Sequence, residues 1–361
     1  MTPRRWLLLV PALPVALLVA AELGGDWALG VRVVRPPRSP DPPLPAADAA
    51  TDPDPAAAGV GLFLRTFTAA RDQPHVATGL LDAERFFAAV TRTDTYRTAG
   101  ADADPIAGPV RARLALVDAV RAGGPGFAPE SVEVRQVLPG DGANEFVAAA
   151  RHRTGGRAAT YRWWLVRAGN GWKVFDLEDV RTGVRLSRQA AGQLIRGGVS
   201  PEVRAGLAAL GPAAAKLAAG DPDGAAAALA PARTAALPPD GFAVRCLIEG
   251  GVAAVTGKAD EARAWADRAD AAAPGMPAVS HLRASAAAAV GDWAAVVGPA
   301  RAYVAAVGPD APTARLLGTA LREMGRPAEA VAAFEMGLRD DPGRADLRAA
   351  RDHARGLAAG K

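Results

Sequence analysis

The sequence is poor in cysteine, histidine and lysine. Cys246 is the only cysteine among 361 residues, which excludes an intramolecular disulfide and a cysteine-based structural zinc site. We expect it to be a small buried residue of a helix rather than a nucleophile. The four histidines are scattered along the chain and form no short metal-ligand pair; they are His75, His152, His281 and His353. Only four of the 42 basic residues are lysines, a bias that, with the many alanines, glycines and prolines, indicates a GC-rich bacterial genome.

Common catalytic signatures are also missing. The chain has no Walker loop and no G-x-S-x-G, H-E-x-x-H or G-x-G-x-x-G motif, and we expect no cofactor. Its 38 acidic residues nearly match the 42 basic ones and are dispersed among them, so there is no basic stripe for nucleic acid. Half of the residues are apolar, which excludes collagen-like, coiled-coil and wholly disordered proteins. The length allows about two domains.

The first 29 residues have the order of a secretory signal. Arg4 and Arg5 precede an uncharged apolar run over residues 6–21, and the first acid is Glu22. Sixteen helical residues reach roughly 24 Å, short of the approximately 30 Å hydrocarbon core, and an anchor extended to residue 29 would bury Glu22 and Asp26. A cleaved signal and a retained membrane anchor both stay open, with a buried helix of a soluble protein as the bland alternative. The charge order places the bulk of the chain outside the cytoplasm, in the periplasm or secreted.

A proline-rich linker follows over residues 30–56. Because it has almost no large apolar residue, it cannot bury a core and is expected to be an extended spacer. Its prolines include Pro36, Pro37, Pro40, Pro42, Pro43, Pro45, Pro53 and Pro55.

Residues 57–193 change from a helical to a strand pattern. Helical spacing predicts one helix around residues 60–67, one around 80–90, and a third with its apolar stripe on Val110, Leu114, Val117 and Val120. After Pro129, short runs rich in valine and aromatic residues alternate with glycine-containing turns, which predicts four antiparallel strands joined as a meander. Bulky residues occupy both alternating faces of 161–166, so this strand is expected to be central.

The string Asn170-Gly171-Trp172-Lys173-Val174-Phe175-Asp176-Leu177 resembles the terminal hairpin of the NTF2-like superfamily. The continuation Gly183-Val184-Arg185-Leu186 also resembles periplasmic phospholipid-carrier proteins of the MlaC type. The resemblance implies an α+β cone of three helices and a four-stranded antiparallel sheet that often encloses an apolar pocket. Some members are enzymes in which a pocket carboxylate works with a tyrosine or histidine.

The resemblance suggests pocket residues in this chain. Asp176 and Glu178 are two residues apart and are expected to share a strand face, whereas solvated carboxylates at a strand end are the bland alternative. The expected pocket residues are Tyr161, Trp163, Asp176 and Glu178, with His152 as a further acid–base candidate. His75, directly after a proline, is expected in a surface loop.

Residues 194–361 carry a repeat of 34 residues. Glycine recurs at Gly257, Gly291 and Gly325, small residues recur at Gly250, Ala284 and Gly318, and a fourth, earlier copy aligns through Gly220. The set Leu317-Gly318, Gly325, Ala330, Phe334 and Pro342 resembles the tetratricopeptide repeat family, which implies stacked pairs of antiparallel helices. Alanine replaces Phe334 in the earlier copies, where Trp265 and Trp293 are expected to supply volume. Residues 344–357 are expected to form a capping helix.

In that family the first helices of the pairs form a groove that usually binds a peptide or another protein. Its apolar half is expected at the amino-terminal end and its charged half at the other. Carried over onto this chain, the groove positions are Leu207, Leu210, Leu217, Val244, Leu247, Val255, His281, Arg315, Arg322 and Glu323.

Three functions follow as hypotheses. The first is a non-catalytic scaffold, exported or membrane-anchored, whose repeats bind a protein partner or simply pack on the central part. The second is an extracytoplasmic carrier that holds a lipid or another apolar ligand in the central cone. The third is an enzyme using Asp176 or Glu178, for which no nucleophile, metal set or phosphate loop is present.

Overall fold

The computed structural model describes residues 55–70, 79–93, 96–97, 109–114, 117, 132–154, 157–180, 183–194 and 200–360. The expected signal or anchor and almost all of the proline-rich linker lie outside these residues. Among the described helices, none has the length and apolar character needed to cross a membrane.

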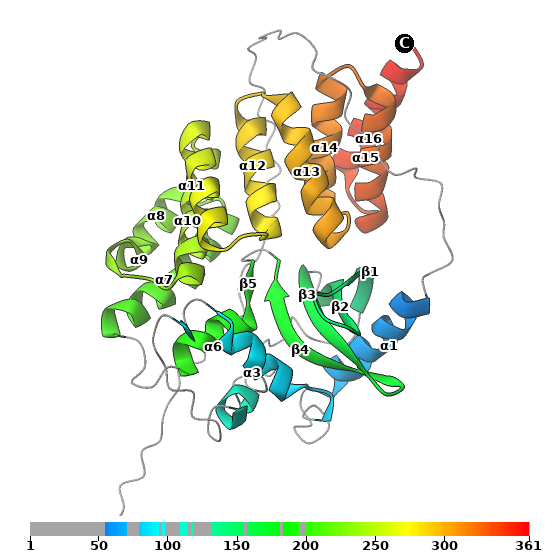
Figure 1. Cartoon of the computed structure of the whole chain (residues 1–361). Helices are drawn as coiled ribbons and strands as arrows, with labels where there is room; N and C mark the ends of the chain where they lie inside the picture. The colour runs from blue at the N-terminus through cyan, green and yellow to red at the C-terminus, as the bar shows by residue number, and fades with distance from the viewer. Residues whose placement is uncertain are drawn as a thin grey trace, which may run out of the picture.

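The chain forms an α+β part followed by a helical part (Figure 1). The first part contains α1 (Pro55–Ala69), α3 (Ala83–Thr91), β1 (Val132–Pro139), β2 (Glu145–Thr154), β3 (Arg157–Ala168), β4 (Gly171–Asp179), β5 (Val184–Arg185) and α6 (Leu186–Leu194). The second part contains α7 (Pro201–Ala218), α8 (Pro222–Ala228), α9 (Ala230–Thr234), α10 (Pro239–Val255), α11 (Ala259–Ala272), α12 (Pro277–Ala289), α13 (Trp293–Val307), α14 (Ala311–Glu323), α15 (Pro327–Asp340) and α16 (Ala345–Ala358).

The sheet is an antiparallel meander in the order β1-β2-β3-β4-β5. The four long strands confirm the predicted pattern, and the two-residue β5 is an addition. β3 is the central strand, as its bulky residues on both faces predicted. On one side it pairs with β2, from Glu145 opposite Val166 to Thr154 opposite Arg157. On the other side it pairs with β4, from Tyr161 opposite Asp179 to Ala168 opposite Gly171.

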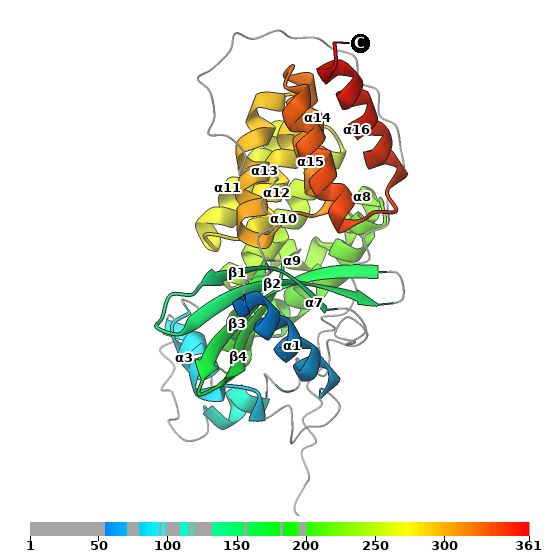
Figure 2. The ribbon, with the colours of Figure 1, turned by 90° about the vertical axis from the view of Figure 1, so that its right-hand side faces the viewer.

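Helices cover one face of the sheet, and their apolar side chains make a filled core there (Figure 2). Phe67 of α1, Phe86 of α3 and Trp163 of β3 are all fully buried, and the rings of Phe67 and Trp163 meet edge to face with centroids 5.7 Å apart. Asp82 begins α3 as its N-cap, because its side chain accepts a hydrogen bond of 3.0 Å from the Arg85 amide.

The expected third helix differs from its predicted orientation. Residues 109–114 and 117 are helical, but Val110 and Leu114 are 57% and 58% exposed, whereas Ala112 is fully buried. The helix therefore turns its small alanine toward the core. The predicted apolar stripe was wrong at Val110 and Leu114, Val117 does pack against the core, and Val120 lies outside the described residues.

Glycine ends the first helix of each hairpin at equivalent bends. Gly220, Gly257, Gly291 and Gly325 have φ angles of 76°, 78°, 69° and 73°. At the last of these bends the Gly325 amide donates to the Arg322 carbonyl at 3.0 Å, and the Arg326 amide donates to the Leu321 carbonyl at 2.9 Å. The same pair of bonds recurs at the other three bends, which makes each a Schellman motif. The 34-residue step from Gly257 to Gly325 thus matches the repetition of the backbone, and the earlier bend at Gly220 precedes Gly257 by 37 residues.

Small residues allow the paired helices to approach closely. A Cβ atom at Gly318 of α14 would overlap the Phe334 ring of α15, which is fully buried. A Cβ atom at Gly250 of α10 would likewise overlap Leu282 of α12. Trp265 and Trp293 are partly buried against the cores of the earlier hairpins, where alanine replaces the phenylalanine. The helix α16 covers the last hairpin with the fully buried Leu347.

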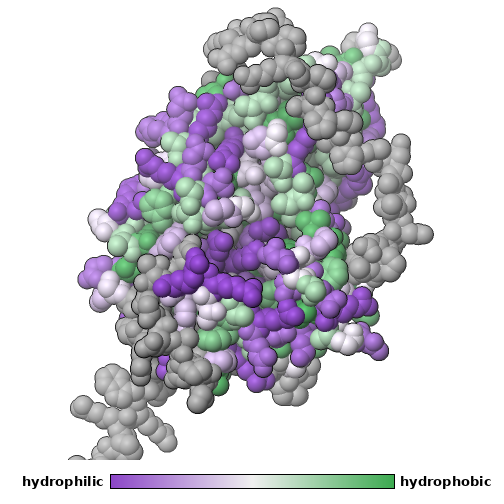
Figure 3. Space-filling model, in the orientation of Figure 1, coloured by the Kyte–Doolittle hydropathy of each residue, from purple (hydrophilic) through white to green (hydrophobic). Residues whose placement is uncertain are grey.

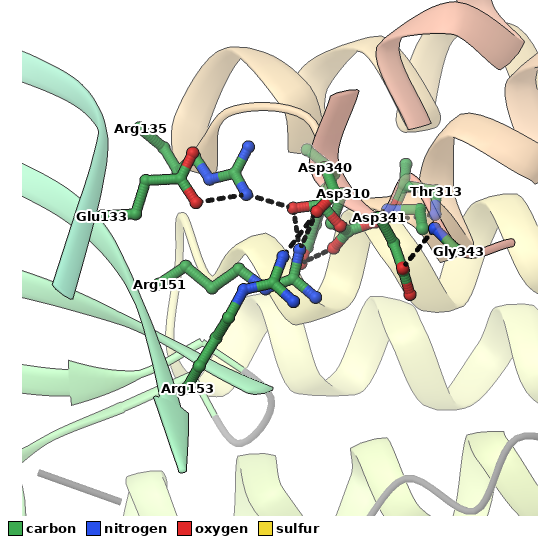
Figure 4. Close-up of polar contacts among 11 residues, drawn as sticks. Glu133, Arg135, Arg151, Arg153, Asp310, Thr313, Asp340, Asp341 and Gly343 are labelled. Atoms are coloured by element: carbon green, nitrogen blue, oxygen red, sulfur yellow. Dashed lines mark hydrogen bonds and ion pairs between the residues drawn. The ribbon is translucent and has the colours of Figure 1, made fainter. Parts of the chain in front are cut away.

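The far face of the sheet contacts the ends of the later hairpins through one buried carboxylate (Figure 4). Asp340, at the end of α15, accepts a bond of 2.5 Å from Arg135, and its Oδ1 also forms an ion pair with Arg151. Its backbone carbonyl accepts bonds from Arg151 at 2.9 Å and Arg153 at 2.6 Å. Its Oδ2 accepts a bond of 3.0 Å from the Ala311 amide at the start of α14. The carboxylate therefore joins two strands to two helices.

Apolar contacts extend this interface. Tyr303 and Val307 of α13 pack with Ala149 of β2 and Val180, and the Gln136 side chain donates to the Ala305 carbonyl at 3.0 Å. Next to β5, a Cβ atom at Gly183 would overlap Met276, which precedes α12. The hairpins are therefore packed directly on the sheet along several elements.

A pair of glycine substitutions tests the bend. Gly325→Ala is expected to lower the free energy of unfolding by about 1 kcal/mol, because space around the position is open and only the left-handed backbone conformation opposes a side chain. Gly356→Ala, inside α16 with equally open surroundings, is the matched control and is expected to raise stability by about 0.5 kcal/mol. Urea denaturation measures both; equal effects of the two substitutions would contradict the bend assignment.

Candidate functional site

The sheet separates the residues of the expected pocket. Tyr161 and Trp163 point into the core under α1 and α3. Asp176 pairs with Trp164 and Glu178 pairs with Arg162 across the β3–β4 ladder, and paired residues share a face. The two carboxylates therefore lie on the face opposite Tyr161 and Trp163. The predicted grouping of all four in one pocket was wrong, because β3 alternates its side chains between the two faces.

Asp176 holds the start of α6. It is fully buried, and one carboxylate oxygen accepts bonds from the Leu177 amide at 2.9 Å and the Ser187 amide at 3.0 Å. The other oxygen accepts a bond of 2.6 Å from the Ser187 hydroxyl. Burial raises the pKa of Asp176, while the Ser187 bonds and the charge of Arg185 oppose this rise. The arrangement is that of a carboxylate satisfying a helix N-terminus from a neighbouring strand.

Glu178 forms a charged layer with two arginines on the same face. It is 1% exposed and accepts two bonds from Arg162 Nη2, at 2.6 and 2.8 Å, and one from its Nε at 3.1 Å. The Arg185 guanidinium lies 3.9 Å from the centre of the Trp164 ring. Burial raises the pKa of Glu178 and lowers that of Arg185, and in both cases the opposite charges nearby work against the shift.

The contacts of Asp176 and Glu178 show that neither carboxylate is solvated. Both are buried, so the alternative of solvated strand-end acids was wrong. Each accepts several hydrogen bonds, as a buried carboxylate must. Sequence inspection missed Arg162, Arg185 and Ser187 as partners, because their approach depends on strand register and on the fold of α6 over β4.

His152 lies on the helix-covered face with the aromatic residues. The Trp163 Nε1–H donates to His152 Nε2 at 3.2 Å, so the neutral ring carries its proton on Nδ1. The ring is edge to face with Tyr161, with centroids 5.3 Å apart. Because the side chain is buried, the pKa of His152 falls to about 4. The pair packs in the apolar core between the helices and the sheet.

The apolar half of the expected groove lies between helices instead of on a free surface. Leu210 and Val244 are 7% and 8% exposed and pack in one core with the partly buried Leu207 and Leu217. Leu247 packs against the neighbouring core of α10, α11 and α12. These side chains fill the space between α7 and the following hairpins. The prediction of an apolar groove lining was therefore wrong for Leu210 and Val244, whereas Leu207, Leu217 and Leu247 are only partly buried.

His281 is also engaged between helices. Its Nδ1 lies 3.1 Å from the Thr313 hydroxyl of α14, and its ring centroid is 5.5 Å from that of Tyr303 in α13. Burial lowers the pKa of His281, and the charge of Asp310 opposes this shift. It tethers three helices and is not a groove residue, contrary to the prediction.

The charged half of the expected groove is accessible. Arg315 and Glu323 are exposed on α14, and Arg322 donates to Glu323 at 2.8 Å. A surface hollow beside them is lined by Arg322, Glu323, Gly325 and Pro327 together with His353 and Leu357 of α16. Val255, at the end of α10, is 59% exposed. Among the described residues, no cluster of three or more histidine, cysteine, aspartate or glutamate side chains is placed to hold a metal ion.

Comparison with protein-family models, curated proteins and solved structures finds no match to this chain.

The buried histidine gives a pH-dependent prediction. His152 has a pKa of about 4 in the folded chain and about 6.5 when unfolded, so the unfolded chain binds its proton first as the pH falls. The neutral His152 side chain therefore contributes about 3 kcal/mol of stability above pH 6.5, and this contribution is lost as the pH falls toward 4. We expect the His152→Gln variant to lack this loss of stability. Its free energy of unfolding should therefore approach that of the wild type as the pH falls toward 4. An NMR titration of His152 with a midpoint near 6.5 would contradict its burial.

Proposed function

We propose that this chain is a non-catalytic, exported or membrane-anchored binding protein of a bacterial cell envelope. Its tetratricopeptide-like hairpins would hold a protein partner on a platform fixed to an NTF2-like module. Support for the tetratricopeptide-like repeat comes from the four Schellman bends and from close helix packing at Gly250 and Gly318. Support for the NTF2-like module comes from the antiparallel meander with helices packed on one face.

The observation that carries the proposal is a row of accessible side chains on the first helices. Val255 of α10, Ala289 of α12, Glu323 of α14 and Leu357 of α16 are separated by 34 residues each, and all four are partly or fully exposed. A face that repeats along stacked helices presents a continuous surface to an extended partner. Arg315 and Arg322 add charge at its carboxyl-terminal end.

The alternative function as an apolar-ligand carrier has less support. Phe67, Phe86, Trp163 and Leu165 are fully buried between the helices and the sheet, where a carried lipid would have to lie. These side chains occupy volume that an acyl chain would need in this part of the described core.

Site-directed photocrosslinking tests the proposal. A photoreactive residue at Glu323 should capture one envelope protein, whereas the same residue at Arg268, exposed on the second helix α11, should not. With that protein purified, the double variant Arg315→Glu, Arg322→Glu is expected to weaken binding at least about 10-fold, or about 1.4 kcal/mol, by calorimetry.

Arg268→Glu is the matched control and should bind as the wild type does. Crosslinking that is equal at both positions, or affinity that is unaffected by the double charge reversal, would remove the assignment of the partner to this face.

A further inference from the structure

A second accessible site lies where the sheet and the early hairpins leave a cleft. It has a volume of about 280 Å³ and lies between α3, the far face of β3 and β4, the start of α6, and the adjoining ends of α10 and α11. The Asp340 contacts close the interface at α14 and α15, whereas this cleft is the part that stays open. In the space-filling view, strongly hydrophilic side chains cross the molecule between the sheet and the hairpins (Figure 3).

Arginines dominate the charged lining of this cleft. Four of them face it, against the three carboxylates of Asp141, Glu145 and Asp240. Arg85 forms an ion pair with Glu145, and Arg188 forms one of 3.1 Å with Asp240. Glu178 and Asp176 lie close enough to Arg185 to oppose the lowering of its pKa.

Arg92 is the fourth arginine that lines the cleft. It is exposed at the end of α3, and within the described parts of the chain its side chain has no ion pair or hydrogen bond. Its guanidinium can therefore bind an anion without first giving up a carboxylate.

The floor of the cleft combines aromatic rings with a guanidinium. Trp164 and Phe175 are 4% and 7% exposed, lie in one apolar cluster, and line the cleft on the sheet side, where the Arg185 guanidinium covers the Trp164 ring at 3.9 Å from its centre. Ala88 and Ala89 of α3 line the opposite wall with short side chains, which keeps the space open. A volume near 280 Å³ at the lower end of the range for ligand pockets suits a small molecule and excludes a folded partner.

We infer that this cleft binds a small organic anion, with its acidic group at Arg92 and its flat apolar body against Phe175 and the Arg185 guanidinium that covers Trp164. It lies on the face of the sheet opposite the filled core, so it is separate from the pocket that the NTF2-like resemblance implies. It also shares no residue with the proposed partner-binding face, so either site can fail without the other.

The probe for this site is 8-anilinonaphthalene-1-sulfonate, which joins an aromatic body to one sulfonate and fluoresces when bound. We expect saturable binding of one molecule to the full chain. Arg92→Glu should weaken it at least 10-fold, and Arg268→Glu, an exposed arginine outside the cleft, should leave it unchanged. Ala89→Trp, which keeps every charge and fills the cleft, should also weaken binding at least 10-fold. Circular dichroism confirms that each variant is folded.

A neutral analogue separates anion recognition from simple apolar binding. N-phenyl-1-naphthylamine has the same aromatic body without the sulfonate, and it is expected to bind at least 10-fold more weakly than the sulfonate. Equal affinity of the two probes, the same affinity in Arg92→Glu as in the wild type, or no saturable binding at all would each overturn the inference.

Discussion

A single buried carboxylate determines how the two parts of this protein are held together. Asp340 is 2% exposed, and a charge so far from water is stable only when opposite charges and hydrogen-bond donors surround it. Arg135 and Arg151 reach it from neighbouring strands, and the Ala311 amide binds it from the start of α14. Because the carboxylate ends α15 and contacts the start of α14, it fixes the last hairpins relative to the sheet.

This arrangement gives the two proposed binding surfaces different surroundings. The hairpins rest on the sheet by the ends of their helices, so the exposed row from Val255 to Leu357 stays clear of the interface. The contact is tight at α13 and α15 and open near α10 and α11, where the arginine-lined cleft remains. A partner protein would meet the first surface and a small anion the second. The exposed row and the cleft thus both result from the way in which the hairpins pack on the sheet.

The local features of this fold were predictable from the sequence, whereas most of its contacts between distant residues were not. The 34-residue glycine step predicted the bends, because a left-handed bend favours glycine at a fixed place in each hairpin. Alternation and turn residues predicted the meander. The same alternation places Trp163 and Asp176 on opposite faces of the sheet, although they were predicted to line one pocket. Leu210, Val244 and His281 were predicted on a surface but fill helix contacts, since a repeat pattern does not show what packs against α7 and α12. Asp340 and its arginines, about 200 residues apart, gave no local signal.

Scanning calorimetry of the full chain tests the role of Asp340 most directly. If the carboxylate joins the two parts, the described α+β and helical parts of the wild type unfold in one cooperative transition. Asp340→Ala should lose about 3–5 kcal/mol, because it leaves buried arginines without their partner, and should unfold in two separate transitions. Asp341→Asn, one residue away, where the side chain accepts a bond of 3.2 Å from the Gly343 amide, should behave as the wild type. A single transition of Asp340→Ala at the wild-type midpoint would contradict the account.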